Sequence, residues 1–295
     1  MISIIVSSYK SENFLTFSQN VKETIGDIIY EIVKIENPGI MGICEAYNIG
    51  IEKSQFSYFC FCHDDILFRT QNWGEKLIFA FQDNPDIGLI GCAGSTYKAW
   101  VPSGWASPQE SSLIKLNLIQ TKNDGRKLKF ISANMLKKLE PVVSLDGCWL
   151  CTKKEITEEF RFDERTFRNY HCYDIDYSLQ VFSKYKVVVI QDILIEHCSD
   201  GNFSSSWLNE TYKLHAKWKE LPKKVQDLTP NQISEQEMNA YSFLLAKTLE
   251  LGTNRIQLLK VLFSLYLVKL LGIGKWLQLF KWTFCALLKK ALIKK

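Results

Sequence analysis

The chain has 295 residues, of which 46% are hydrophobic and 23% charged, a composition typical of a globular protein rather than a disordered or collagen-like one. Its formal net charge of +4 is unevenly distributed. Residues 252–295 contain eight lysines, Arg255 and no acid, which leaves 27 basic against 32 acidic residues in the rest of the chain. This asymmetry argues against a uniformly basic protein that coats nucleic acid, and we expect no nucleic-acid partner.

Nine cysteines, an odd number, lie largely in apolar runs such as Phe59–Cys62. This pattern indicates reduced, buried thiols in a cytoplasmic protein. Cys148 and Cys151 form a CxxC pair, but Trp149 and Leu150 between them favour a buried strand over a zinc or redox site. The first six residues lack the charged segment and cleavage site of a signal peptide, and we interpret them as the start of a strand.

The first 95 residues alternate between apolar runs and amphipathic stretches. Predicted strands are Ile2–Ser8, Ile28–Ile35, Phe56–Cys62 and Ile87–Cys92, and predicted helices include Gly42–Lys53 and Asn72–Phe81. Repeated β-α-β units predict an α/β fold with a doubly wound, mainly parallel sheet and flanking helices. In such sheets ligands bind beyond the carboxyl ends of the strands, so we look for chemistry there.

The middle of the chain is more irregular. Residues 97–112 resemble a loop, and Leu113–Ile131 is predicted to be a hairpin around Asn123-Asp124-Gly125. Further predicted elements are strand Val142–Cys151, helix Tyr173–Tyr185, strands Val187–Ile190 and Ile193–His197, and helices Ser205–Lys219 and Ser234–Leu251. We therefore expect residues 1–250 to form one catalytic domain and residues 251–295 an appended helical tail.

Acidic and histidine side chains follow several of these strands. The triplet His63-Asp64-Asp65 comes directly after the third one, where carboxylates can hold a divalent cation that bridges to phosphate. A surface turn is the alternative for this triplet. Asp174 and Asp176 open a helix, where acids are also ordinary caps. His197 ends a strand and could be purely structural, and Asp146-Gly147 could be a plain turn.

The order of these motifs resembles that of family 2-type glycosyltransferases of the GT-A fold, over about residues 1–205. The matching stretches are Ile2–Tyr9, Glu31–Asn37, Ala46–Gly50, Phe59–Asp65, Ile90–Ser95, Leu145–Leu150, Tyr173–Leu179 and Ile195–His197. The chain has His-x-Asp where the family usually has Asp-x-Asp, and Tyr-Asp where it usually has Glu-Asp, which is similar to a bacterial subgroup.

The resemblance implies roles for individual residues. Asp65 and His197 would bind Mn²⁺ or Mg²⁺, and a mixed Asp/His set suits Mn²⁺ somewhat better. His63 occupies the position of the first acid of the motif. The residues implied to line the donor site are Ser7, Ser8, Tyr9, Glu36, Asn37, Asn48, His63, Asp64 and Asp146.

Asp174 is implied to be the general base of an inverting reaction. A positioned carboxylate that takes the proton of the acceptor hydroxyl speeds such a transfer by about 10²–10⁴-fold. Asp176 is the second choice for this role or a helix cap. Trp100, Trp105 and Trp149 could stack on sugar rings, although a place in the protein core is favoured for Trp149.

The tail has its own pattern. From Lys275 onward, a helical projection places Lys275, Gln278, Lys281, Cys285 and Lys289 on one arc, and Leu277, Phe280, Phe284, Leu287 and Leu288 opposite. Lysines facing bulky apolar residues indicate an amphipathic helix lying on an anionic membrane surface. Helices packed on the body or on a dimer partner are the alternative. We expect a peripheral protein on the inner face of the cell membrane.

Together these features predict a metal-dependent, inverting glycosyltransferase. It would move a sugar from a nucleotide-sugar donor to a hydroxyl of a saccharide acceptor. The acceptor would be linked to a lipid, and the reaction would belong to surface polysaccharide synthesis. The alternative is a catalytically inactive relative that binds sugar or scaffolds an assembly. A nucleotidyltransferase is disfavoured because Ser7-Ser8-Tyr9 after the first strand contains no glycine.

Overall fold

The computed structural model describes residues 1–106, 111–131, 137–199, 201 and 203–293. It divides into two compact units, which we describe separately. Unit 1 comprises Met1–Thr96 and Ile114–Gly201, and unit 2 comprises Tyr97–Leu113 and Asn202–Lys295. The boundary predicted after residue 250 falls inside unit 2, where helix α7 (Pro230–Leu251) ends.

Unit 1 is built on a seven-stranded sheet. In spatial order its strands are β10 (Leu139–Val142), β13 (Lys186–Ile190), β5 (Ile87–Gly91), β12 (Trp149–Lys153), β3 (Tyr58–Cys62), β1 (Ile2–Ser8) and β2 (Tyr30–Glu36). Strands β12 and β10 are antiparallel to their neighbours, and the other five strands run in one direction. The predicted α/β class with a mainly parallel sheet is therefore confirmed.

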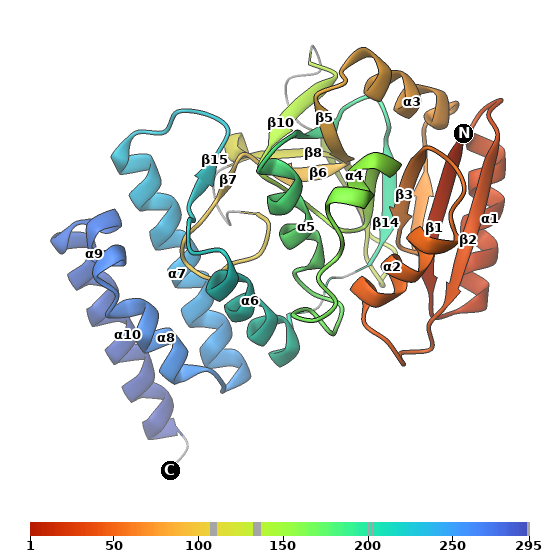
Figure 1. The fold of residues 1–295 in the computed structure, drawn as a ribbon. Coiled ribbons are helices and arrows are strands. Elements are labelled where there is room, and N and C mark those ends of the chain that lie inside the picture. Colours follow the sequence, from red (N-terminus) through yellow and green to blue (C-terminus); the bar gives the residue numbers. More distant parts are fainter. Residues whose placement is uncertain (107–110, 132–136, 200, 202, 294–295) are drawn as a thin grey trace. The chain divides into compact units, whose positions relative to one another are not determined.

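Helices flank this sheet (Figure 1). They are α1 (Ser11–Thr24), α2 (Ile43–Lys53), α3 (Trp73–Asp83), α4 (Lys154–Glu159) and α5 (Tyr173–Phe182). The crossovers through α1 and α2 step in opposite directions from β1 to β2 and from β2 to β3, so right-handed connections place these two helices on opposite faces. Strand β1, which lies between β3 and β2, has no exposed surface on Ile2, Ile4, Ile5 and Val6, as expected for a strand covered on both sides.

Unit 1 also contains a second, six-stranded sheet. Its order is β11 (Ser144–Leu145), β6 (Ala93–Ser95), β8 (Ile114–Thr121), β14 (Ile195–Cys198) and β4 (Ile66–Phe68), and β9 (Lys127–Ile131) pairs with β8. The predicted hairpin around Asn123-Asp124-Gly125 is therefore confirmed. In the antiparallel pair of β14 and β4, His197 lies opposite Ile66, which places it beside Asp65.

The prediction of one continuous strand over Val142–Cys151 is wrong. The chain leaves β10, forms the short β11, and turns at Asp146-Gly147 before it enters β12. The Asp146 carboxylate accepts the backbone N–H of Cys148 at 2.9 Å, which stabilises this turn in place of strand pairing. The interruption places Asp146 in a turn between β11 and β12 instead of within a strand.

Unit 2 is mainly helical. Besides α7 it contains α6 (Ser205–Lys217), α8 (Arg255–Leu262), α9 (Leu265–Leu271), α10 (Ile273–Ile293), the short strands β7 (Tyr97–Lys98) and β15 (Lys223–Lys224), and a 3₁₀ turn (Ser111–Leu113). The loop predicted over residues 97–112 is irregular between β7 and that turn, and its residues 107–110 lie outside the described ranges. Helix α7 begins at Pro230, four residues before the predicted start, because Thr229 and Gln232 form a capping box.

All nine cysteines lie in the described ranges, and none forms a disulfide. Seven are buried, as predicted, whereas Cys198 and Cys285 are exposed. Across the residues that the structure describes, no helix has both the length and the apolar character needed to span a bilayer.

Candidate active site

Three side chains converge beyond the carboxyl end of β3. Nδ1 of His63 lies 3.8 Å from Oδ1 of Asp65, and Nε2 of His197 lies 3.5 Å from the same oxygen. One ligand atom from each residue falls within 4.8 Å of the other two. His63 and Asp65 come from the loop after β3, and His197 comes from β14, so the second sheet completes the cluster.

The donor atoms of this cluster fit a divalent cation. Oδ1 of Asp65 and Nε2 of His197 are buried and contact each other at 3.5 Å, but neither makes a well-formed hydrogen bond with any residue that the structure describes. Buried polar atoms without a hydrogen bond are costly, and a bound ion would satisfy both. Ligands about 2.1 Å from one ion lie roughly 3–4 Å apart, so only a small contraction is needed. These residues would hold Mn²⁺ or Mg²⁺.

Burial and neighbouring charges shift the pKa values of all three residues of the cluster. Burial lowers the pKa of His63, so its imidazole is neutral at pH 7 and available as a ligand. Burial also acts to lower the pKa of His197, but the neighbouring Asp65 outweighs burial and raises it. For Asp65, burial acts to raise the pKa, and the two histidines outweigh it and lower the pKa.

A second group of predicted residues lies at the ends of β1, β2 and β3. The Ser8 hydroxyl donates to Oδ2 of Asp64 at 3.1 Å. The Asn37 amide donates to the Ser7 hydroxyl at 3.1 Å and to the carbonyl of Met41 at 3.0 Å. The structure therefore joins four of the predicted donor-site residues into two hydrogen-bonded pairs at one edge of the sheet.

Asp174 and Asp146 form the third part of this edge. Asp174 sits in the first turn of α5, and burial together with the nearby Asp146 raises its pKa from 3.8 to about 7. Asp146 also acts on His63 and His197, so it lies within electrostatic reach of both the metal cluster and Asp174. A carboxylate whose pKa is near neutrality is well matched to accept a proton from a hydroxyl.

Asp176 is buried and is held by a neighbouring side chain of α5. Its side chain is 1% exposed, and it accepts a hydrogen bond from Gln180 at 2.8 Å. Trp149 is fully buried and its ring lies edge-on to Trp73 and Phe68, so it belongs to the core of unit 1. Trp100 belongs to unit 2, where its ring lies against Tyr266.

The remaining predicted donor-site residues make other contacts. Glu36 pairs with Lys34 at 2.6 Å, and the side chain of Tyr9 projects into solvent. The Asn48 amide donates to the carbonyl of Phe162 and to Glu164, so it ties α2 to the loop before α5. Their part in donor binding stays a prediction.

The sequence did not indicate that Tyr173 contacts both Gly147 and His63 at this edge. The Tyr173 hydroxyl lies 2.7 Å from Nε2 of His63 and donates to the carbonyl of Gly147 at 3.0 Å. The available signal was that His63 and Tyr173 both depart from the motifs that the rest of the sequence resembles.

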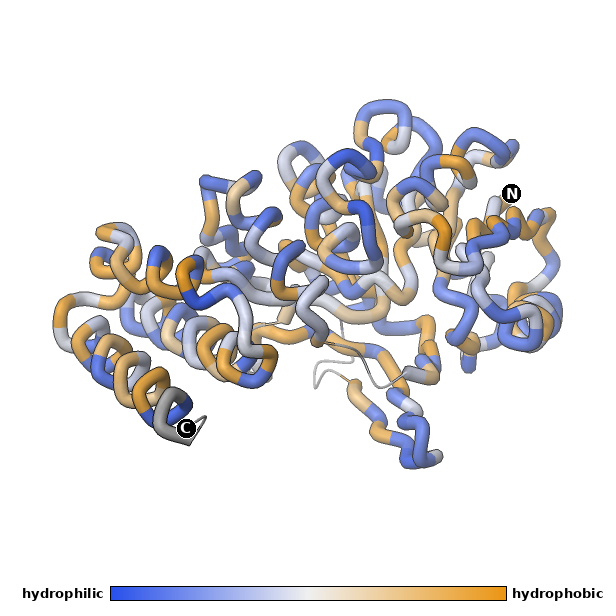
Figure 2. Tube along the Cα trace, turned by 90° about the horizontal axis from the view of Figure 1, so that it is seen from below, coloured by the Kyte–Doolittle hydropathy of each residue, from blue (hydrophilic) through white to orange (hydrophobic). Residues whose placement is uncertain are grey.

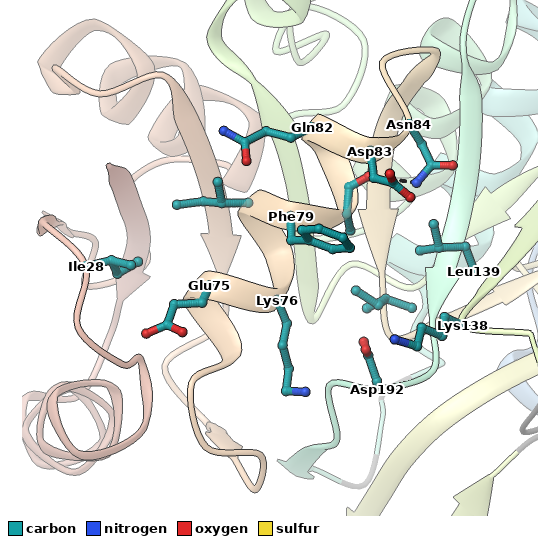
Figure 3. A pocket seen from close by; sticks show the side chains of 13 residues that line it. Ile28, Glu75, Lys76, Phe79, Gln82, Asp83, Asn84, Lys138, Leu139 and Asp192 are labelled. Carbon is teal, nitrogen blue, oxygen red and sulfur yellow. Dashed lines mark hydrogen bonds between the residues drawn. The ribbon is translucent and has the colours of Figure 1, made fainter.

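The molecule also contains a large pocket of about 750 Å³ over α3 (Figure 3). Phe79, Lys76 and Asp83 of α3 line it together with Lys138 and Leu139. None of the predicted site residues lines this pocket. A smaller pocket of about 600 Å³ lies between Gly39–Gly42 and the loop at Glu164–Tyr170, next to Asn37.

Comparisons with known proteins agree with this geometry. A family model described as a glycosyltransferase-like family matches residues 3–225. Comparison with curated protein sequences finds no match. Among solved structures, GalNAc-T7 with UDP, GalNAc and Mn²⁺ is similar at 10% identity and a TM-score of 0.52, covering 74% of this chain and 48% of that one.

Residues 1–349 of S. aureus TarS are similar at 13% identity and a TM-score of 0.51, covering 87% of this chain and 76% of that one. The same TarS fragment in complex with UDP gives a TM-score of 0.52 at 13% identity, covering 88% and 78%. At these identities the likeness establishes the fold. Because the family model matches more than half of the chain, this protein belongs to the glycosyltransferase-like family, and it is an enzyme of the family 2 type with a GT-A fold.

Proposed function

We propose that this chain is a metal-dependent, inverting glycosyltransferase. It would transfer a sugar from a nucleotide-sugar donor to a hydroxyl of a saccharide acceptor, lipid-linked in surface polysaccharide synthesis. The observation that carries the proposal is the convergence of His63, Asp65 and His197 at the sheet edge that also bears Asp174. UDP accompanies Mn²⁺ in the solved GalNAc-T7 and is bound by the TarS fragment, which supports a nucleotide diphosphate at the corresponding edge here.

The chain's own residues would divide the work. His63, Asp65 and His197 would hold the cation, which when bound stabilises negative charge on the departing nucleoside diphosphate. Ser7, Ser8, Asn37 and Asp64 would shape the nucleotide side of the donor site.

Asp174 would take the proton of the acceptor hydroxyl. As that oxygen bonds to the anomeric carbon, the bond from carbon to the diphosphate oxygen breaks on the opposite face, which gives inversion. The proton ends on the Asp174 carboxylate, and the bonding electrons leave with the diphosphate. The raised pKa of Asp174 makes it a stronger base than an exposed aspartate, and about half of it is ionised at pH 7.

Thermal-shift screening of nucleotide sugars with and without Mn²⁺ tests this proposal. We expect one donor to stabilise the protein only when Mn²⁺ is present, and Asp65→Ala to abolish that stabilisation. Product formation then tests the transfer reaction itself. Asp174→Ala should bind the donor but lose transfer, and unchanged transfer in both variants would refute the assignment.

We propose further that α8, α9 and α10 bind an anionic membrane surface. Large apolar side chains are exposed on all three helices and at Phe263, which follows α8: Ile256, Leu265, Tyr266, Ile273, Leu277, Trp282, Phe284 and Leu288. Figure 2 shows these helices as alternating apolar and polar turns. Residues 252–295 contain no acid, so no carboxylate within this segment neutralises the positive charge of its lysines.

The packing of α10 refines the predicted arcs. Leu279 and Thr283 are buried, and Thr283 contacts the hydroxyl of Tyr241 on α7 at 3.1 Å. The apolar side chains of α10 therefore divide between an inward face and an outward face. Leu277, Phe284 and Leu288 point outward next to Lys281 and Lys289, which is the mixed surface that an interfacial helix presents.

Vesicle co-sedimentation tests the membrane proposal. Lysines contribute about 1 kcal/mol each near an anionic surface, so Lys281→Gln with Lys289→Gln should weaken binding to phosphatidylglycerol vesicles by about 20- to 30-fold. Lys53→Gln, on the exposed end of α2 in unit 1, is the control. Point variants are preferable to a truncation at residue 250, which would uncover the buried Tyr241 and Leu244 of α7. Equal binding to neutral phosphatidylcholine vesicles would contradict the proposal.

A further inference from the structure

The two residues that depart from the usual family motifs touch each other. His63 stands in place of the first acid of Asp-x-Asp, and Tyr173 stands in place of the glutamate of Glu-Asp. They are 110 residues apart in the chain, and Nε2 of His63 lies 2.7 Å from the hydroxyl of Tyr173. Their proximity indicates that the two departures act together.

The hydrogen bonds of Tyr173 determine which ring nitrogen of His63 carries the proton. A phenol hydroxyl has a single proton to donate. The carbonyl of Gly147, 3.0 Å away, can only accept, so both contacts are hydrogen bonds when Tyr173 donates to Gly147 and accepts from His63. Nε2 of His63 is then the protonated nitrogen, and Nδ1 keeps its lone pair. That Nδ1 is the atom that lies 3.8 Å from Oδ1 of Asp65.

The packing around Tyr173 holds this geometry in place. Its side chain is 4% exposed, and its ring lies against Tyr47 and Phe162 at 5.9 and 6.3 Å between centroids. A Cβ atom at Gly147 would overlap the Tyr173 hydroxyl, so only glycine at that position lets the hydroxyl reach both partners.

We propose that Tyr173 is a positioning residue that holds His63 in the Nε2–H tautomer, with Nδ1 directed at the cation position. His63 thereby becomes a third protein ligand beside Asp65 and His197. The pair replaces two carboxylates by two neutral groups, which lowers the negative charge of the site and favours Mn²⁺ over Mg²⁺. This inference rests on the metal centre of the proposed function.

Calorimetric titration of the intact chain with Mn²⁺ tests the role of Tyr173 without measuring turnover. Loss of an outer-shell partner of a ligating histidine weakens metal binding by about 10- to 100-fold, and we expect this for Tyr173→Phe. The matched control is Tyr177→Phe, one helical turn along α5, whose buried ring packs on Phe61 and Phe162. It should bind Mn²⁺ like the wild type. Thermal melting of both variants establishes that they are folded.

Imidazole nitrogen NMR tests the tautomer directly in the metal-free protein. The chain has four histidines, and the His63 signals are assigned by their loss in His63→Asp. We expect His63 to be the Nε2–H form in the wild type and a mixture of tautomers in Tyr173→Phe. In the His63→Asp background, Tyr173→Phe should cause no further loss of Mn²⁺ affinity, because no ring remains to be positioned.

Unchanged Mn²⁺ affinity in folded Tyr173→Phe would overturn the role of Tyr173 and leave the proposed function intact. An Nδ1–H tautomer in the wild type would overturn it as well. A wild-type protein that binds no Mn²⁺ would overturn the metal centre itself, and with it both proposals.

Discussion

Replacing Asp174 by asparagine should stabilise the protein while it abolishes transfer. Burial and Asp146 raise the pKa of Asp174 from 3.8 to about 7, so the ionised carboxylate is unfavourable in the folded state. Each pKa unit corresponds to about 1.4 kcal/mol, which puts the cost of ionisation at up to about 4 kcal/mol above pH 7. Asparagine has nearly the same shape, can still accept the backbone N–H of Ile175, and carries no charge to bury.

The pH dependence identifies the cause of this gain. Between pH 4 and 7 the folded carboxyl keeps its proton while the unfolded one has lost it, so wild-type stability falls as pH rises through this range. The gain from Asp174→Asn should therefore be about 2–3 kcal/mol larger at pH 8 than at pH 5.

Urea denaturation in EDTA, followed by tryptophan fluorescence at both pH values, measures the difference. Asp27→Asn applies the same chemical change at an exposed position and should change stability by less than about 0.5 kcal/mol at either pH. A gain that is equal at pH 5 and pH 8, or a loss of stability, would refute the electrostatic reasoning. Full transfer activity in Asp174→Asn would refute the assignment of the base.

Three further outcomes are expected. The kcat/KM of transfer should fall about tenfold per pH unit below an apparent pKa near 7, because Asp174 must be ionised to accept a proton. A kcat/KM that is flat from pH 5 to 8 would exclude Asp174 as the base. Glu237→Ala should lower the free energy of unfolding by about 3 kcal/mol or more in denaturation experiments. The reason is that the buried carboxylate accepts hydrogen bonds from the Tyr97 hydroxyl and from the backbone N–H groups of Trp100 and Val101. A loss below about 1 kcal/mol would count against that network. A thiol reagent should label Cys198 and Cys285 rapidly in the native protein and the other seven cysteines only after unfolding, and rapid labelling of more than two would contradict the burial pattern.

The core of the fold was predictable because its strands are continuous apolar runs. Ile2–Ser8 matches β1 at both ends, and Phe56–Cys62 and Ile87–Cys92 differ from β3 and β5 by at most two residues. A strand buried on both faces must be apolar throughout, so its sequence shows it directly. The interruption of Val142–Cys151 was marked only by Asp146-Gly147, a possible turn inside a run whose one other polar residue is Ser144.

The ends of helices depend on capping residues, which the periodicity of apolar residues does not reveal. The start of α7 is marked by Thr229, Pro230 and Gln232, a capping box with proline in the first turn. Apolar periodicity begins only later, so the predicted helix started at Ser234. In unit 2, nothing in the sequence around Lys98 indicates that this lysine is fully buried with its amine bonded to Ser103.

The sequence suggested individual site residues but not the contacts between them. His63, Asp65, His197 and Asp174 were identified from their order along the chain, and the structure brings three of them together. The contact between His63 and Tyr173 joins residues in different elements, so only the three-dimensional arrangement reveals it. Asn48 is a second example of such a contact. Its amide donates to the carbonyl of Phe162, 114 residues further along the chain, and the sequence around Asn48 does not indicate this hydrogen bond.

Calorimetric binding of nucleoside diphosphates is the most direct test of a donor held through the cation site. UDP and the other common nucleoside diphosphates would be titrated into the wild-type chain in Mn²⁺ and in EDTA, and into Asp65→Ala and His197→Ala in Mn²⁺. We predict that at least one diphosphate binds the wild type only in Mn²⁺, and that both substitutions abolish this binding. Equal affinity in EDTA, or full affinity in the two variants, would contradict the metal-dependent glycosyltransferase proposed here.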